Sequence, residues 1–235
     1  MVLLDNQNCQ PISECQMRVY YLTETQFGLS NLALRRLKVA RFADLNDPFE
    51  LLALDLGSRN LRIGISAKKK QINNEQGLVC FSRSWRDPLL WSHYGEKHRG
   101  LCLGFDVPDA VLKQVAYVKG LQKVDVASPA TPQHVVTNLL DRLRYTKFDG
   151  WKYEDEVRRF VDLRTLKPQG GLYFLPFSDE LVPREVILGS RSALPIETVR
   201  EFVQSFSPPI RVMRSRIAFT KFAVVEDRSS RIPRG

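Results

Sequence analysis

The sequence predicts an α+β fold with a largely antiparallel or split sheet and flanking helices. Strand-like and helix-like segments mix along the 235 residues without the regular rhythm of βαβ units. Hydrophobic residues make up 43% of the chain, as in an ordinary globular domain. Because no internal repeat or low-complexity tract divides the chain, we expect one domain over residues 17–235, after an irregular lead-in over 1–16.

The first third of the chain alternates between strand and helix signals. Period-two alternation indicates the strands, and leucines spaced three or four residues apart indicate a helix. Clustered Asn, Asp and Pro are typical of a turn, while a stretch rich in Lys, Asn and Gln suggests exposure to solvent. We therefore expect a strand over 18–22, a helix over 27–36, a strand over 38–42, a turn over 44–50 and an exposed polar segment over 56–76.

The centre of the chain is its most informative region. Apolar runs over 78–81 and 101–105 predict two buried strands. Between them, Asp87 suits an N-cap and Pro88 the first helical position, so we expect a short helix. This arrangement places the aromatic residues that follow near one sheet edge, where they either pack or hold a ligand.

The remaining elements are predicted by the same signals. They are a helix over 107–114, a strand over 116–118, a loop over 127–133, a helix over 134–145, strands over 159–163, 172–177 and 182–188, a helix over 195–206 and closing strands over 210–225.

Charge and composition limit the classes of function. The net charge of +9 favours polyanionic partners, although no nucleic-acid fold signature accompanies it. The four Cys form no CxxC pattern, so we expect no metal site and a cytoplasmic protein. No apolar run approaches the roughly 18 residues of a membrane span, and no signal peptide is recognisable, so we expect no membrane partner.

Several catalytic motifs are missing from the sequence. It contains no glycine-rich phosphate loop and no G-x-S-x-G elbow, and its three His are too poorly spaced for a zinc protease. The candidates are therefore polar residues in aromatic settings. In the turn over 46–50, Asp47 or Glu50 either fixes the turn or points into a cleft.

The short helix and the loop after it supply a second candidate set. Trp91 or Tyr94 can stack on a ring, and Arg99 can bind phosphate in bidentate fashion. His93 is either an acid/base or a hydrogen-bonded structural residue.

The segment over 151–158 supplies the third set. If a strand runs through it, Glu154, Glu156 and Arg158 share one face. The structural interpretation is an ion pair between Glu156 and Arg158, and the functional one is a catalytic carboxylate whose pKa Arg158 sets. We expect Glu156, more than Glu154, to face the cleft.

Seven blocks carry a resemblance to a known family: 20–22, 46–50, 80–82, 91–94, 100–105, 151–158 and 186–189. Taken in order, they resemble a bacterial family catalogued as domain of unknown function 2971. The match extends over about residues 18–190. The family name implies no activity.

The opening layout is also similar to the ADP-ribosyltransferase fold, especially to toxins that modify nucleic acid. This resemblance implies NAD as the substrate and Glu156 or Glu154 as the catalytic acid, because a carboxylate stabilises the oxocarbenium-like state of nicotinamide–ribose cleavage. Together with the candidates from the turn, the short helix and the loop after it, the expected NAD-binding set is Tyr20, Tyr21, Ser82, Trp91, His93, Tyr94, Arg99 and Asp47.

The leading hypothesis is therefore an ADP-ribosyltransferase-like enzyme or NAD glycohydrolase, of the toxin or anti-phage effector type, acting on nucleic acid. Its expected partners are nucleic acid and an antitoxin or other protein. One alternative is a non-enzymatic module that binds nucleic acid or a nucleotide. A third is a metal-dependent nuclease that uses Asp47, Glu50, Glu154 and Glu156.

Overall fold

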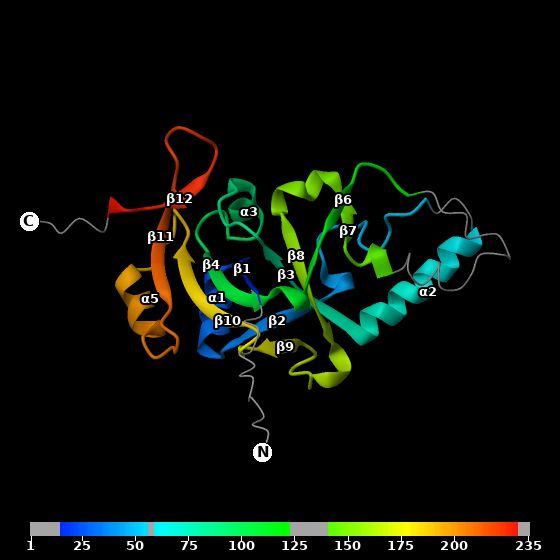
Figure 1. The fold of residues 1–235 in the computed structure, drawn as a ribbon, viewed down its shortest axis with the longest axis horizontal. Coiled ribbons are helices and arrows are strands. Elements are labelled where there is room, and N and C mark those ends of the chain that lie inside the picture. The colour runs from blue at the N-terminus through cyan, green and yellow to red at the C-terminus, as the bar shows by residue number, and fades with distance from the viewer. Residues whose placement is uncertain (1–14, 56–58, 123–140, 230–235) are drawn as a thin grey trace, which may run out of the picture.

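The computed structural model describes residues 15–55, 59–122 and 141–229 (Figure 1). Most of the expected lead-in, the loop over 127–133 and most of the helix over 134–145 lie outside these residues. The described part is a mixed α+β structure built around a large, curled sheet, as the sequence predicts.

The sheet has ten strands and is antiparallel except where β10 runs parallel to β11. Its strands are β1 (Gln16–Thr23), β2 (Arg36–Arg41), β3 (Gln76–Ser82), β4 (Leu101–Pro108), β5 (Leu112–Gln114), β8 (Glu156–Asp162), β9 (Tyr173–Pro176), β10 (Val182–Leu188), β11 (Arg211–Ile217) and β12 (Val224–Glu226). A separate parallel pair consists of β6 (Ala116–Val118) and β7 (Thr146–Phe148).

Helices lie on both faces of the sheet. The α-helices are α1 (Thr25–Ala33), α2 (Arg59–Glu75), α3 (Pro88–His93) and α5 (Ile196–Val203). Short 3-10 turns are η1 (Phe42–Asp44), η2 (Asp109–Val111), η3 (Asp149–Glu154) and η4 (Leu163–Thr165). Among the described residues, no helix is long and apolar enough to cross a membrane.

The sheet splits along one edge of β3. On its other edge, β3 pairs with β8 over its whole length. β1 reaches the split edge only at Ser82, through Tyr20, whereas β2 reaches it only at Gly77 and Leu78. β1 and β2 therefore diverge, and residues 79–81 lie between them with no strand partner on that side in the described part of the chain.

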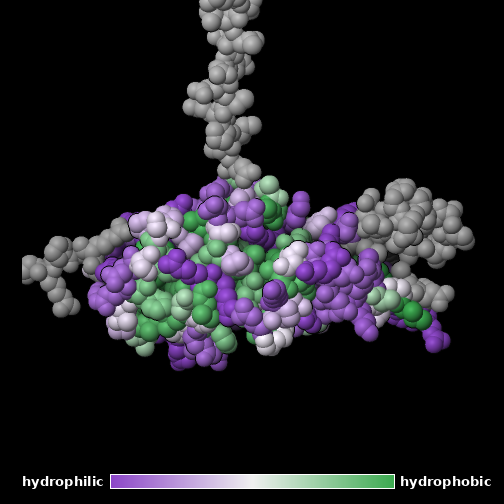
Figure 2. Space-filling model, turned by 90° about the horizontal axis from the view of Figure 1, so that it is seen from below, coloured by the Kyte–Doolittle hydropathy of each residue, from purple (hydrophilic) through white to green (hydrophobic). Residues whose placement is uncertain are grey.

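The two faces of the sheet are buried differently. One face carries the main apolar core, to which α1 and α5 contribute, and side chains such as Val79, Phe81 and Val157 point into it. Seen from below in Figure 2, the surface mixes polar and apolar side chains, and the apolar ones gather at the end that carries α5. The opposite face holds two smaller apolar clusters, one containing Phe42 and Leu78 and the other containing Trp91.

Two segments differ from their sequence interpretation. The described part of the polar stretch over 56–76 is largely exposed, as expected, but it forms α2, which was not predicted; Ile65 and Ile72 provide a narrow buried face on this otherwise hydrophilic helix. The helix expected over 107–114 is wrong: η2 gives way to β5, which pairs with β8 from Leu112 onwards. Tertiary pairing overrides local helix preference there.

Candidate functional site

A cavity of about 320 Å³ lies where β1 and β2 diverge. Its wall includes Tyr20 from β1, Ala40 from β2 and Cys80 from β3. The volume is in the range of small-molecule sites. Residues of an antiparallel strand alternate in the direction of their main-chain groups, so some N–H and C=O groups of 79–81 face away from β8, towards this gap.

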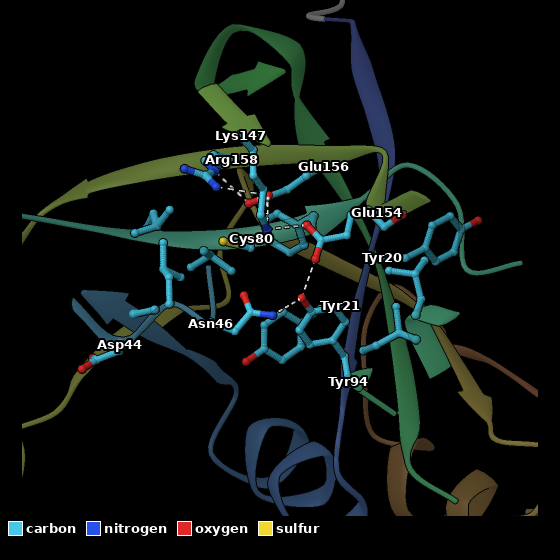
Figure 3. A pocket seen from close by; sticks show the side chains of 18 of the residues that line it. Tyr20, Tyr21, Asp44, Asn46, Cys80, Tyr94, Lys147, Glu154, Glu156 and Arg158 are labelled. Carbon is cyan, nitrogen blue, oxygen red and sulfur yellow. Dashed lines mark hydrogen bonds and ion pairs between the residues drawn. The ribbon is translucent and has the colours of Figure 1, made fainter. Parts of the chain in front are cut away.

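Arg158 of β8 organises the deepest part of the site (Figure 3). Its guanidinium group donates to both carboxylate oxygens of Glu50, at 2.6 and 3.0 Å. It also donates to Glu156, from Nε at 2.7 Å and from Nη2 at 3.1 Å. A further bond of 2.7 Å reaches the main-chain oxygen of Arg144, so this fully buried cation is held on three sides.

Lys147 connects this ion pair to the rest of the cavity. Its Nζ lies 3.3 Å from Glu156 and 2.5 Å from Glu154, and all three side chains are buried. The same ammonium lies 4.8 Å from the centre of the Trp151 ring, where a cation–π contact stabilises it further.

Glu154 stands at the end of a hydrogen-bond chain. Its Oε1 accepts from the hydroxyl of Tyr94, and that hydroxyl accepts from Nδ2 of Asn46 at 2.6 Å. Figure 3 shows these three side chains meeting at the Tyr94 hydroxyl, with dashed lines that join it to Asn46 and to Glu154. One carboxylate oxygen of Glu154 is therefore bonded to a neutral phenol and the other to Lys147.

The environment separates the pKa values of the three carboxyls. Burial raises the pKa of Glu50 and of Glu154, despite the nearby cations. Burial acts in the same direction on Glu156, but Arg158 and Lys147 outweigh it and lower the pKa to about 2. Glu156 is thus the permanently charged member, whereas Glu154 and Glu50 are displaced towards the neutral form.

The charges of the cluster do not balance when every group is ionised. Three carboxylates face two cations, Arg158 and Lys147, which leaves one excess negative charge. Uptake of one proton would neutralise the cluster, and a buried site favours neutrality. A carboxyl with a raised pKa inside a cavity is a suitable proton acceptor.

The structure brings together most of the candidates predicted from sequence. The cavity is lined by Tyr20, Tyr21, Ser82, Tyr94, Glu154 and Glu156. Burial raises the pKa of both Tyr20 and Tyr21 to about 12, so these rings stay neutral over the physiological range.

Four other candidates do not line the cavity: Trp91, His93, Arg99 and Asp47. Trp91 is buried and donates to the main-chain oxygen of Trp85 at 2.6 Å. His93 packs against Trp151 and Tyr153 beside the site. Arg99 is exposed, whereas Asp47 is buried and accepts from the main-chain N–H of Phe49 at 2.9 Å.

The expected register of the acidic segment is wrong in one respect. Glu156 and Arg158 do share a face of β8, and the anticipated ion pair between them exists. Glu154, however, precedes the strand in η3, and Asp155 between them has a left-handed backbone with φ of 43°. Both glutamates line the cavity because this residue turns the chain.

Lys147 is the functional candidate that sequence reasoning missed. It belongs to β7 and is buried, although lysine is among the residues least often found inside proteins. The nearby acidic residues were the available signal, because a cluster of buried carboxylates needs buried cations.

The fold and site thus define an α+β protein with a charged, tyrosine-lined pocket at a split in its sheet. Residues 90–159 match the family model described as protein of unknown function (DUF2971), which supports the resemblance to that family over this part of the chain. The matched segment contains Tyr94, Lys147, Glu154, Glu156 and Arg158. No curated protein and no solved structure matches the chain.

Proposed function

We propose that this protein is an ADP-ribosyltransferase-like enzyme that cleaves NAD between nicotinamide and ribose, with NAD as its substrate. The observation that carries the proposal is Glu154, a buried carboxylate with a raised pKa, held by Tyr94 and Lys147 inside a tyrosine-lined pocket. The split, largely antiparallel sheet and the β1–α1–β2 opening agree with the predicted resemblance to that fold.

The chemistry requires few groups from the protein. The bond between ribose C1′ and the nicotinamide nitrogen breaks, and its electron pair leaves with nicotinamide. A carboxylate near the ribose 2′-hydroxyl stabilises the oxocarbenium-like cation, and the pull is stronger in a buried site. The acceptor then bonds to C1′, and its proton passes to Glu154.

Glu154 suits this role better than Glu156. Arg158 binds both oxygens of Glu156, and Lys147 approaches it as well. Those contacts keep the pKa of Glu156 near 2, so it is a poor proton acceptor. We assign Glu156 to the positioning of Lys147 and Glu154 to the reaction.

The remaining wall suits a planar ring. Three tyrosines line the cavity. Tyr20 and Tyr21 pack against apolar clusters on opposite faces of the sheet, so Tyr94 is the ring that offers a surface for stacking. Main-chain groups of residues 79–81 offer hydrogen bonds to a ring substituent. A ligand of nucleoside size is compatible with a cavity of about 320 Å³.

The net charge of +9 supports nucleic acid as the acceptor. With such an acceptor, the enzyme would act in the cytoplasm as a toxin or anti-phage effector, held in check by an antitoxin or other protein partner. A metal-dependent nuclease is less well supported. Among the described residues, no group of three or more His, Cys, Asp or Glu side chains is arranged to hold a metal ion.

Incubation with NAD labelled on its adenine half, together with single-stranded DNA, duplex DNA, RNA or mixed protein, tests the proposal. We expect nicotinamide release and transfer of label to one acceptor class, or to water when no acceptor is present. Saturable NAD or nucleic-acid binding without nicotinamide release would contradict the enzyme and favour the non-enzymatic binding module.

A further inference from the structure

The hairpin that joins β11 to β12 exposes two phenyl rings at its tip. Phe219 is 89% exposed and Phe222 is 101% exposed, the highest values among the large apolar residues of the described chain. The hairpin is closed by a bond of 2.9 Å from the N–H of Ala218 to the oxygen of Ala223. Isolated exposed apolar residues are common, but two on one projecting tip indicate a contact surface.

The tip is also basic. Residues 216–223 contain Arg216 and Lys221 and no carboxylate. The guanidinium carbon of Arg216 lies 4.5 Å from the centre of the Phe219 ring, and Lys221 is exposed between the two phenylalanines. Aromatic faces alternating with cations match the chemistry of single-stranded nucleic acid, in which bases stack and phosphates pair with Arg or Lys.

The hairpin is joined to the cavity through the segment that follows β3. The N–H of Val224 donates to the main-chain oxygen of Arg86 at 2.8 Å. Only three residues separate Arg86 from Ser82, which lines the cavity. Arg86 is exposed, and its guanidinium carbon lies 4.8 Å from the ring centre of Trp85, so the segment that contacts the hairpin carries a third cation. Figure 1 shows the loop between β11 and β12 rising on the side of the sheet that also carries α3.

We propose that the 218–223 hairpin docks single-stranded nucleic acid, with bases stacked on Phe219 and Phe222 and phosphates paired with Arg216 and Lys221. This inference rests on the proposed function, because it identifies the acceptor class that the cavity would modify. Duplex is disfavoured, because its bases are already stacked on each other and phenyl rings reach them only in a single strand.

Fluorescence anisotropy with a labelled, mixed-sequence single-stranded oligonucleotide, in DNA and RNA versions, tests the docking site without any turnover. We expect Phe219→Ala and Phe222→Ala each to weaken binding about tenfold, since stacking on an aromatic side chain contributes about 1–3 kcal/mol per base. Phe27→Ala, which removes a 54% exposed ring on α1, is the matched control and should leave affinity unchanged. Because all three rings are largely exposed, thermal unfolding should be unaffected.

The salt dependence separates the two kinds of contact. Lys221→Gln should lower the slope of affinity against salt concentration, whereas Phe222→Ala should weaken binding at every salt concentration with the same slope. Unchanged oligonucleotide affinity in both Phe variants would overturn the proposal. The proposal would also be overturned if the Phe variants lost binding to phosphatidylserine vesicles, or lost self-association, while their oligonucleotide binding stayed intact. A wild-type protein that binds oligonucleotide but releases no nicotinamide would contradict the proposed enzyme and leave the docking site standing.

Discussion

Replacing Glu156 by Gln removes the carboxylate that bridges Arg158 and Lys147. The two cations lower its pKa from the ordinary value of 4.5 to about 2. At about 1.4 kcal/mol per pH unit, this difference corresponds to about 3 kcal/mol of stability. We therefore expect Glu156→Gln to lower the free energy of unfolding by about 3 kcal/mol at neutral pH.

The pH dependence of this loss follows from the sign of the pKa change. A carboxyl whose pKa is lower in the folded state stabilises the fold at pH values above 4.5. That contribution disappears as the pH falls through about 2, where the folded protein also binds the proton. The difference between wild type and variant should therefore be complete at pH 7 and shrink progressively between pH 4.5 and 2.

Urea unfolding followed by tryptophan fluorescence at several pH values measures this difference. Glu180→Gln is the matched control, because it removes an exposed partner of Arg159 on the same strand and should cost less than about 1 kcal/mol. A loss below about 1 kcal/mol for Glu156→Gln, or a loss that does not diminish in acid, would refute the assignment of Glu156 as the charged anchor of Arg158.

Three further substitutions probe other parts of the structure. Tyr94→Phe removes a hydrogen-bond donor that lowers the pKa of Glu154. The pKa of Glu154 should therefore rise further, which a carboxyl ¹³C NMR titration measures; an unchanged pKa would contradict the contact. Gly100→Ala would place a Cβ 2.2 Å from the main-chain oxygen of Thr23, so urea unfolding should show a loss of more than about 2 kcal/mol. Gly64→Ala in α2 meets open space and should instead gain about 0.5–1 kcal/mol; equal effects of the two glycine variants would contradict the packing described.

Much of the strand order along the chain was predictable, because apolar runs such as 78–81 and 101–105 are strong local signals. The convergence of Tyr94, Glu154 and Glu156 was also predictable as a hypothesis, since these residues stand out in apolar and aromatic settings. The sequence could predict that the sheet is split, but not that the split lies at β3, because the register that causes it depends on long-range pairing.

Other features depend on tertiary context that local patterns do not contain. Lys147 is buried because it pairs with the two carboxylates of Glu154 and Glu156, whereas its sequence position is typical of an ordinary surface lysine. The left-handed backbone at Asp155 occurs without a glycine, so no glycine in the sequence indicated the turn of the chain between η3 and β8. Trp91 looked like a ligand-stacking residue but fills a core beneath the site.

The central claim is that Glu154 reacts and Glu156 positions, and nicotinamide release from NAD tests it most directly. Glu154→Gln should unfold with nearly wild-type stability, because the raised pKa of Glu154 means that its neutral form is not disfavoured in the fold. We predict that this variant releases nicotinamide at least about a hundredfold more slowly than wild type. If folded Glu154→Gln released nicotinamide at the wild-type rate, the assignment of Glu154 to the reaction would be contradicted.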